Sequence, residues 1–577
     1  MTSSAKRILL GPYTSSFPVS TLLPSSGQYT QLLDIMRLNC TYNPHERDQI
    51  RGLIDAIPGE ISRYDHELAS RGRFSEVVVA DRATLQNLLD RCRSAITSPI
   101  RKLPTEVLLL IFHEVCWAAV ESCHPVFDQN RDQATPKEYR RLAGGDLANI
   151  AQVCYQWHML VDSDPLLWTS ITMDMRSWAT EGDMEDVPES LFQASMLLHN
   201  ALMRGNELPI DVEALVPRCH PFGLVALAQS STRWRSANLL IDSVMAPCFK
   251  MVHHNLPFLE RLRLRFIHED TAEGPKDIVE YFSDAPQLKS LYYCGPVDVL
   301  QPLPMEQLLL FCCSQLVPED MLPLIKLLPR LSHSIVIHLD LDAFAIDDRP
   351  LQLPLVESSL RDLSFATATV AGLGPRTLSQ RVLGEILDAL KLPSLARFSL
   401  LYALREEPIL WPHSQGLAFF QRSRCQGHSQ LETLHLHHVI ITEEELIECL
   451  HELPTLRDLY VTDHADVVLP NNPRHVLITD TLLQRLSPNP DDIPGSLVPM
   501  LASVHFKTVG KFSDAVLLEF IEKRVGAVAY WDLENEPFDC CVSWILGYIR
   551  GLGQQQAAAI ENMAQNGELE FTMRVDM

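Results

Sequence analysis

The stretches "LARFSL" (residues 395–400), "LETLHL" (431–436) and "LRDLYV" (456–461) decide how most of this chain is expected to fold. They share the spacing Leu-x-x-Leu-x-Leu, in which another bulky apolar residue can replace the later leucines. Related copies begin at Leu259, Leu360 and Leu501, a partial copy begins at Leu288, and a weaker one begins at Trp234. One apolar pattern that recurs in this way predicts a repeated structural unit.

Helical patterns fill the intervals between these strand-like stretches. "LGEILDAL" precedes one copy and "ITEEELIECLHELP" precedes another, and Thr442 lies three residues before Glu445, which is the spacing of a capping box. A recurring strand and helix predict an α/β leucine-rich-repeat-like solenoid. We expect it over residues 231–530, with a helical linker at 173–230 and a C-terminal cap at 531–577. The alternative is a compact α/β domain in which some of these matches arise by chance.

The chain before the solenoid is expected to be mainly α-helical. In residues 46–98 the apolar side chains have helical spacing, which predicts a helical pair or a short coiled coil interrupted at Pro58. A structural spacer is the expected role, and self-association is the alternative. Residues 1–45, rich in Ser, Thr and Pro, are predicted to be disordered. The two stripes of the helical pair are Ile50, Leu53, Ile54, Ile57, Ile61, Tyr64 and Leu68, then Leu85, Leu88, Leu89 and Cys92.

The stretch "SPIRKLPTEVLLLIFHEVCWAAV" (98–120) predicts a helix that has no polar face. Pro104 suits the first helical turn, and Glu106 lies near the positive end of the helix dipole. From Val107 onward the apolar side chains point in nearly every direction. A helix that is apolar all round must be buried all round, so something has to cover its second side.

A polar loop is expected at residues 121–145, before the stretch "DLANIAQVCYQWHMLVDSDPLLWTSITM" (146–173). The spacing of its first apolar residues predicts one helix face. "DSDP" is expected to end that helix, because the residue before a proline avoids helical angles. The helix face consists of Leu147, Ile150, Val153, Cys154 and Trp157, and Leu167 and Trp168 follow as an apolar anchor.

The composition of the chain argues against several classes of protein. Apolar residues make up 46% of the chain, enough for packed cores, and a net charge of −25 argues against a nucleic-acid binder. No apolar run approaches the roughly 20 residues that cross a bilayer, so no membrane contact is expected. The 14 cysteines are scattered without a Cys-x-x-Cys spacing, which favours reduced thiols in a cytoplasmic or nuclear protein.

No motif predicts an enzyme. The chain contains no Gly-rich phosphate loop, no His-Glu-x-x-His and no Gly-x-Ser-x-Gly, so we expect no catalytic residues and no cofactor. His435 and His437 have a spacing that could begin a metal site. We expect instead that these two histidines form an outward-facing polar pair on a strand, and we predict no metal site.

The strand pattern also predicts a binding surface. If Leu262 and Leu264 face the core, the residues that alternate with them face the concave side of the solenoid. An ordinary solvated strand face is the expectation there, and the alternative is that a row of three arginines binds an acidic or phosphorylated segment. The candidate client-binding residues are Arg261, Arg263, Arg265, Arg397, His435, His437, Asp458 and Tyr460.

Residues 99–172 resemble the F-box. The resemblance rests on "LPTEVLLLIFHEV", with its Leu-Pro-x-Glu-hydrophobic opening, and on "LANIAQVCYQWHMLVDSDPLLWTSI", with its Val-Cys-x-x-Trp centre and Leu-Trp close. Together with the helical prefix and the degenerate repeats, it looks like the fungal type of F-box-like protein. Two departures are the long insertion at 121–145, and Tyr155–Gln156 where members often carry basic residues.

This resemblance implies a function. In the family, the F-box helices bind a Skp-type adaptor, which joins them to a cullin–RING ubiquitin ligase, and the adaptor would cover the second side of the apolar helix. The repeats would then bring an unknown client protein for ubiquitination. The alternative is a repeat scaffold that binds partners without a ligase. The residues that the resemblance assigns to the adaptor contact are Leu103, Pro104, Val107, Leu108, Ile111 and Phe112, with Val153, Cys154, Trp157, Leu167 and Trp168 supporting or joining it.

Overall fold

The computed structural model describes two compact units, which are treated separately below. The helical unit comprises the described residues up to Trp168, and the solenoid comprises those from Thr169 onward. The residues that the structure describes are 19–23, 36, 42–71, 76–97, 99–121, 145–174, 189–216, 222–266, 273–340, 350–368, 380–402, 409–425, 429–437, 439–463, 476–489, 491–530, 537–544 and 552–575.

The helical unit begins with the predicted helical pair, α2 (Pro44–Arg71) and α3 (Glu76–Thr97). The predicted stripes meet between the two helices and form one buried cluster. The expected interruption at Pro58 is wrong, because α2 continues through this residue. Its missing N–H leaves the carbonyl of residue 54 without its helical donor, a cost that packing of both flanking turns offsets.

Part of the segment predicted to be disordered packs against this pair. Leu23, Met36 and Tyr42 are buried in the same cluster, and the Ser20 backbone N–H donates to the Tyr64 hydroxyl at 3.0 Å. The disorder prediction is therefore wrong for these residues. The other residues of 1–45 lie largely outside the part that the structure describes.

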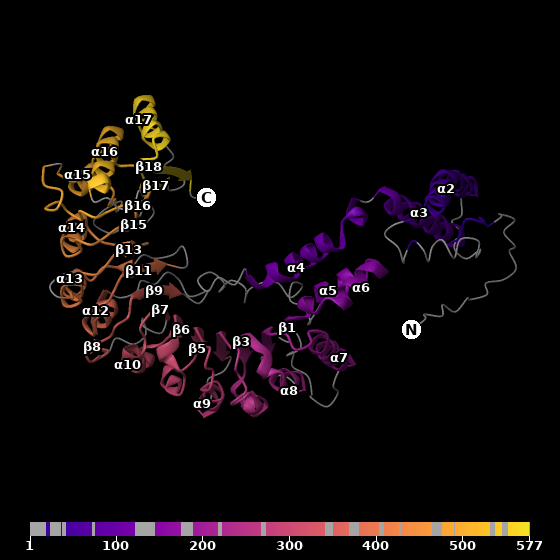
Figure 1. Ribbon diagram of the computed structural model, residues 1–577, viewed down its shortest axis with the longest axis horizontal. Coiled ribbons are helices and arrows are strands. Elements are labelled where there is room, and N and C mark those ends of the chain that lie inside the picture. The colour runs from indigo at the N-terminus through magenta and orange to yellow at the C-terminus, as the bar shows by residue number, and fades with distance from the viewer. Residues whose placement is uncertain are drawn as a thin grey trace. The chain divides into compact units, whose positions relative to one another are not determined.

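The solenoid is built on one parallel sheet whose strand order follows the chain. Each main strand pairs with the next, which requires a crossover connection rather than a hairpin between them. Figure 1 shows the strands side by side along the inner edge of the solenoid. Within the described residues, the 14 strands of this sheet are β1 (Ser170–Asp174), β2 (Ile210–Val216), β3 (Trp234–Ile241), β4 (Arg261–Phe266), β5 (Ser290–Cys294), β6 (Leu310–Leu316), β7 (Ser334–Asp340), β9 (Asp362–Ala368), β11 (Arg397–Tyr402), β13 (Thr433–Leu436), β15 (Asp458–Thr462), β16 (Ser503–Thr508), β17 (Phe538–Trp544) and β18 (Leu569–Val575).

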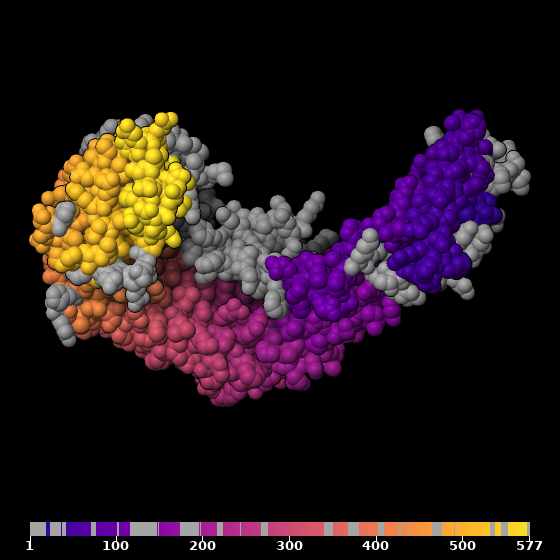
Figure 2. All heavy atoms as spheres, turned by 45° about the horizontal axis from the view of Figure 1, so that its top comes forward, coloured from indigo at the N-terminus to yellow at the C-terminus, as the bar shows by residue number. Residues whose placement is uncertain are grey.

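Helices cover the outer side of this sheet (Figure 1), and the stacked repeats form one continuous curved band (Figure 2). Two short strand pairs, β8 (Val356–Glu357) with β10 (Leu390–Lys391) and β12 (Ile409–Leu410) with β14 (Val439–Ile440), join neighbouring repeats. The helical segments are α7 (Glu189–Arg204), α8 (Phe222–Gln229), η6 (Ser231–Arg233), η7 (Ser243–Val252), α9 (Glu273–Glu280), η8 (Val297–Leu300), η9 (Met305–Gln307), α10 (Pro318–Leu327), η10 (Leu328–Arg330), α12 (Gln380–Asp388), α13 (His413–Arg422), α14 (Glu443–His451), α15 (Asp480–Leu486), α16 (Asp514–Tyr530) and α17 (Gln554–Gln565).

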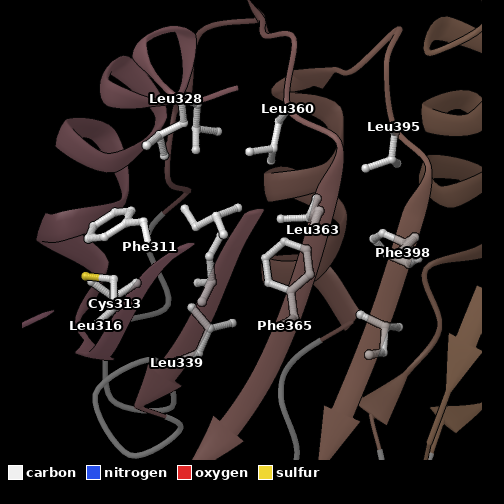
Figure 3. Close-up of a cluster of buried hydrophobic side chains, with 14 of the residues drawn as sticks. Phe311, Cys313, Leu316, Leu328, Leu339, Leu360, Leu363, Phe365, Leu395 and Phe398 are labelled. Carbon is white, nitrogen blue, oxygen red and sulfur yellow. The ribbon is translucent and has the colours of Figure 1, made fainter. Parts of the chain in front are cut away.

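The leucine pattern marks the core of the solenoid. The first leucine of each full copy lies two residues before its strand, and it is buried at Leu259, Leu360, Leu395, Leu431, Leu456 and Leu501. Alternate strand residues then point into the same layer. Figure 3 shows this layer, where Phe311, Phe365 and Phe398 come from three strands and lie below Leu328, Leu360 and Leu395.

The sheet extends beyond the predicted limits of 231–530 at both ends. The segment 173–230, predicted to be a helical linker, contains α7 and α8 but also β2, which pairs with β1 and β3. The predicted cap at 531–577 contains β17 and β18, which continue the sheet. Both segments bury alternating side chains that are not leucine, such as Val212 and Val542, and the leucine pattern does not detect them.

Candidate functional site

The candidate adaptor-binding domain consists of short helices around a small core. They are η2 (Pro99–Lys102), α4 (Thr105–Glu121), α5 (Gly145–Ala151), α6 (Tyr155–Ser163) and η4 (Pro165–Trp168). The expected polar loop at 121–145 lies outside the described residues except at its two ends. The single helix predicted after it is two helices, because Gln152–Cys154 form a turn between α5 and α6.

One side of α4 faces this core. Leu108 and Phe112 are each 1% exposed, and the Phe112 ring meets the Trp157 ring of α6 in an edge-to-face contact, with centroids 4.8 Å apart. The Trp168 indole N–H donates to the Val161 carbonyl at 2.7 Å, which holds η4 against α6. Among the described side chains of these helices, Leu147, Val161 and Leu167 are also buried.

A pair of ionisable side chains, His113 and Asp164, lies at the edge of the same core. The His113 Nε2 atom of α4 lies 3.0 Å from the Asp164 Oδ2 atom at the end of α6, and both side chains are largely buried. The other oxygen of Asp164 accepts a hydrogen bond from the Leu166 backbone N–H at 3.0 Å. Asp164 therefore ties α4 to the turn between α6 and η4, and it fixes the orientation of α4.

α4 also carries a second apolar stripe, beside the buried one, that is open to solvent. The stripe includes Leu110, which is 67% exposed, and Val115, which is 49% exposed. Complete burial of such side chains stabilises a structure by roughly 1.5–3 kcal/mol each, so covering this stripe would release several kcal/mol in total. We call this set the exposed stripe; its members are Val107, Leu110, Ile111 and Val115.

The residues predicted to contact an adaptor fall into three groups. Leu108, Phe112, Leu167 and Trp168 are buried within the described structure and form the core of the domain. Leu108 and Phe112 are therefore not open to a partner in this structure, whereas burial of Leu167 and Trp168 agrees with the supporting role that was one of their two expectations. Leu103, Cys154 and Trp157 are half-buried. Pro104, Val107, Ile111 and Val153 are exposed.

Sequence reasoning missed several exposed apolar residues. Leu110 and Val115 belong to the stripe, and Tyr155, Met159 and Leu166 are exposed on or beside α6. The helical period of α4 could have separated the two sides, because Leu108 and Phe112 are four residues apart, as are Val107 and Ile111. The pattern alone does not say which of these two sides faces the core.

The strands of the solenoid present the predicted alternation on their other face. In β4, Leu262 and Leu264 are buried, whereas Arg261, Arg263 and Arg265 lie on the opposite side. Their charges are partly engaged. The Arg261 guanidinium lies 3.7 Å from Asp211, and the Arg263 guanidinium stacks over the Tyr292 ring at 4.3 Å.

Two further side chains on this face, Asp362 and Tyr292, interact with its arginines. The Arg397 Nη2 atom lies 2.5 Å from the Asp362 Oδ2 atom, and this hydrogen bond raises the pKa of Arg397. Burial raises the pKa of Tyr292, so its hydroxyl stays protonated at neutral pH. The sequence analysis did not identify the partners Asp211, Asp362 and Tyr292, because strand register decides which side chains become neighbours.

Aromatic rings line the C-terminal part of the same face. Tyr460 stacks on His505 with centroids 4.2 Å apart, and its other side meets His435 at 4.8 Å. Burial, and after it the neighbouring His505, lower the pKa of His435 to about 4, so His435 is neutral at physiological pH. His437 lies 6.1 Å from His435, ring centroid to ring centroid.

Asp458 is not free on this face, because its Oδ2 atom accepts a hydrogen bond from the Thr433 hydroxyl at 2.9 Å. His505 was missed by the sequence analysis, and its Nε2 atom lies 3.2 Å from Asp539. The structure thus brings together His435, Tyr460 and His505 as one row, whereas the arginines of β4 lie several strands away in the same sheet.

No helix within the described ranges is both long and apolar enough to cross a membrane. A comparison with curated protein sequences gives no match. The solved structures similar to this chain include the yeast Rad7 and Elc1 complex, with 12% sequence identity over 66% of this chain and 95% of that chain, and a TM-score of 0.26. A superposition with this score does not establish a common fold.

A protein-family comparison matches the helices of the candidate domain, including α4, which carries the exposed stripe. The model of the F-box-like family matches residues 100–174, which run from η2 to the end of β1. This range agrees with the helices around the Phe112–Trp157 core and includes the whole exposed stripe. The chain therefore carries an F-box-like domain at residues 100–174.

Proposed function

We propose that this protein is the substrate-recognition subunit of a Skp–cullin–F-box type ubiquitin ligase. Its F-box-like domain would bind a Skp-type adaptor, and its solenoid, which we take to be of the leucine-rich-repeat kind, would bind a client protein. The observation that carries the proposal is the exposed stripe on α4 within residues 100–174. Solvent-exposed apolar side chains gathered on one element mark interaction surfaces.

The exposed stripe supports this proposal because of where it lies on its helix. The core side of α4 is already filled by contacts within the domain, including Phe112 with Trp157. The stripe is separate from that core, so a partner can cover Leu110 and Ile111 without repacking the domain. The His113–Asp164 pair holds the stripe in one orientation before any partner binds.

The proposed mechanism is proximity rather than catalysis by this chain. A client held on the solenoid would have its lysines kept near the transfer site of the ligase, which raises their effective concentration. The concave-face row of His435, Tyr460 and His505 and the arginines of β4 are the surfaces that we assign to the client. We expect the protein to work in the cytoplasm or nucleus, without a cofactor.

Co-purification of the full-length chain with a Skp-type adaptor and cullin tests this function. We expect the wild-type chain to retain both, and Leu110→Glu to lose both, because a charge within the stripe cannot be buried against an apolar partner without a large penalty. Leu110 is 67% exposed, so this substitution leaves the core intact. A circular dichroism spectrum checks the fold.

The matched control is Met203→Glu, which places the same charge on an equally exposed apolar residue of α7 in the solenoid. This variant should retain adaptor and cullin. If the wild-type chain captures no adaptor, or if Leu110→Glu captures as much as wild type, the ligase assignment fails. Retention of client without any cullin would favour a ligase-independent repeat scaffold.

A further inference from the structure

Two consecutive histidines and an aspartate meet where two neighbouring repeats of the solenoid are packed together. His253 and His254 directly follow η7, and Asp284 lies in the turn after α9. Buried anchors fix both turns, since Val252 precedes the histidines and Phe282 and Ala285 flank the aspartate. The three side chains are therefore presented from elements held by the core.

The backbone of the histidine turn has an uncommon conformation. His254 adopts a left-handed φ of 65°, a region that non-glycine residues occupy only at a cost. The side chain of Asn255 supports the turn, because its amide donates to the Met251 carbonyl at 2.9 Å and to the His253 carbonyl at 3.3 Å. Adjacent side chains on extended backbone point in opposite directions, whereas this turn puts both rings on one side.

The result is a convergence of three metal-ligand groups. The two imidazole rings stack with centroids 3.7 Å apart, and His254 Nδ1 contacts Asp284 Oδ2. One ligand atom from each residue lies within 4.8 Å of the others. Among the described residues, no other three His, Cys, Asp or Glu side chains come together in this way.

The local charge favours a cation at this place. Tyr281 lies beside His253, with ring centroids 6.1 Å apart. The carboxylates of Asp277 and Glu280 belong to the same segment as Tyr281 and lie close enough to act on its hydroxyl electrostatically. Together with Asp284, these carboxylates are three acidic groups near the turn, against two lysines on the same elements, Lys250 of η7 and Lys276 of α9.

We propose that His253, His254 and Asp284 form a binding site for one divalent transition-metal ion, with the chemistry of a zinc site. Two imidazole nitrogens and one carboxylate oxygen are three of the four ligands of a tetrahedral ion, and water would supply the fourth. The two rings stack face to face, so they must tilt apart to share an ion. The exposed His254 ring has room to do so.

A metal at this site would act as a clip between two repeats. It would link the turn after η7 to the turn after α9, two segments that otherwise meet through apolar packing between their helices. Because an ion that binds only the folded chain stabilises it, zinc should raise the thermal midpoint of the solenoid. The sequence gives no sign of this site, since neither the adjacent histidines nor the distant aspartate match a metal-ligand spacing.

The competing explanation is that the three residues only stabilise the turns, through the stacked rings and the contact between His254 and Asp284. Titration of the full-length, chelator-treated chain with Zn²⁺ in a calorimeter separates the two explanations, and Co²⁺ adds a direct readout through its visible absorption. We expect one tight site in the wild-type chain and tetrahedral-type Co²⁺ bands. A merely structural role produces neither signal.

Two variants remove ligands with little disturbance of the backbone. His254→Asn keeps a residue type that tolerates the left-handed conformation, and Asp284→Asn keeps the shape of the side chain. Each should weaken the tight Zn²⁺ site by at least ~10-fold and abolish the Co²⁺ bands. The matched control is His45→Asn on the exposed surface of α2, which should bind like wild type.

Two results would overturn the proposal. The first is a wild-type chain without a tight site for Zn²⁺. The second is a tight site that survives in both His254→Asn and Asp284→Asn, which would place the ion at other histidines or cysteines. Thermal midpoints in the presence of a chelator check that the variants fold, and only the wild-type and His45→Asn chains should gain stability when Zn²⁺ is added.

Discussion

Phe112 and Trp157 meet edge to face across the F-box-like core, while Ile111, the residue directly before Phe112, faces solvent. Two neighbouring positions of α4 therefore have opposite roles. One position holds the domain together, and the other belongs to the exposed stripe. Substitutions at the two positions should separate folding of the domain from binding of a partner.

We predict that Phe112→Ala destabilises the F-box-like domain by about 3–5 kcal/mol, because it removes the ring contact with Trp157 and leaves a cavity. Ile111→Ala should cost only about 1–2 kcal/mol, since the side chain is already 37% exposed. Hydrogen exchange of α4 and α6 measures the difference. Equal protection of both helices in the two variants would contradict this assignment of core and surface.

The sequence predicted the existence of the F-box-like helices but not their two sides. Apolar residues occupy nearly the whole circumference of α4, so the hydrophobic periodicity does not show which side of the helix faces the core. The direction is set by residues far along the chain, such as Trp157 and Asp164, which contact one side of α4. The turn at Gln152–Cys154 was missed because apolar spacing continues across it.

The repeat pattern predicted the parallel strands well where leucines occupy the core positions. It missed β6, in which Phe311 and Cys313 fill the positions that leucines fill elsewhere, after a buried Leu308. It also missed β7, where one additional residue separates Leu331 from Ile335. The core selects apolar volume rather than leucine itself, so a pattern written for leucine finds only part of the sheet.

A buried arginine stabilises the C-terminal repeats. Arg524 of α16 is fully buried and donates to the carbonyls of Val498 at 2.8 Å, Leu497 at 3.1 Å and Leu486. Burial lowers the pKa of Arg524 to about 9, so the group remains charged at neutral pH. It serves as the shared hydrogen-bond donor for the end of α15 and the loop that follows.

We predict that Arg524→Met lowers the stability of the solenoid by roughly 2–4 kcal/mol, because three buried carbonyls lose their donor. The matched control is Lys523→Met. Lys523 makes an exposed pair with Glu519 at 2.7 Å, one helical turn away, so its loss should cost less than about 0.5 kcal/mol. Thermal midpoints measure both, and similar midpoints for the two variants would refute the role given to Arg524.

The predicted capping box at the start of α14 is confirmed. The Thr442 hydroxyl accepts from the Glu445 backbone N–H at 3.2 Å, and the Glu445 carboxylate accepts from the Thr442 backbone N–H at 2.9 Å. We expect Thr442→Ala to cost about 1 kcal/mol in the thermal stability of this repeat, and Thr442→Ser to cost much less. A loss as large in the serine variant would show that the methyl group, not the cap, matters.

His338 provides a test of pH dependence. It is 2% exposed on β7, pairs in register with Ala366, and neither ring nitrogen has a hydrogen-bond partner. Burial lowers its pKa to about 4 from an ordinary value of 6.5. A base with a lowered pKa contributes stability above pH 6.5 that is lost as the pH falls through 4, because the unfolded chain binds the proton more readily.

We therefore predict that His338→Leu is more stable than wild type by roughly 1 kcal/mol at pH 8, and that its advantage grows by up to about 3 kcal/mol as the pH falls from 6.5 to 4. The exposed His333→Leu is the control and should show no such growth in thermal melts across this range. A constant difference between wild type and His338→Leu would mean that His338 is not buried as a neutral imidazole.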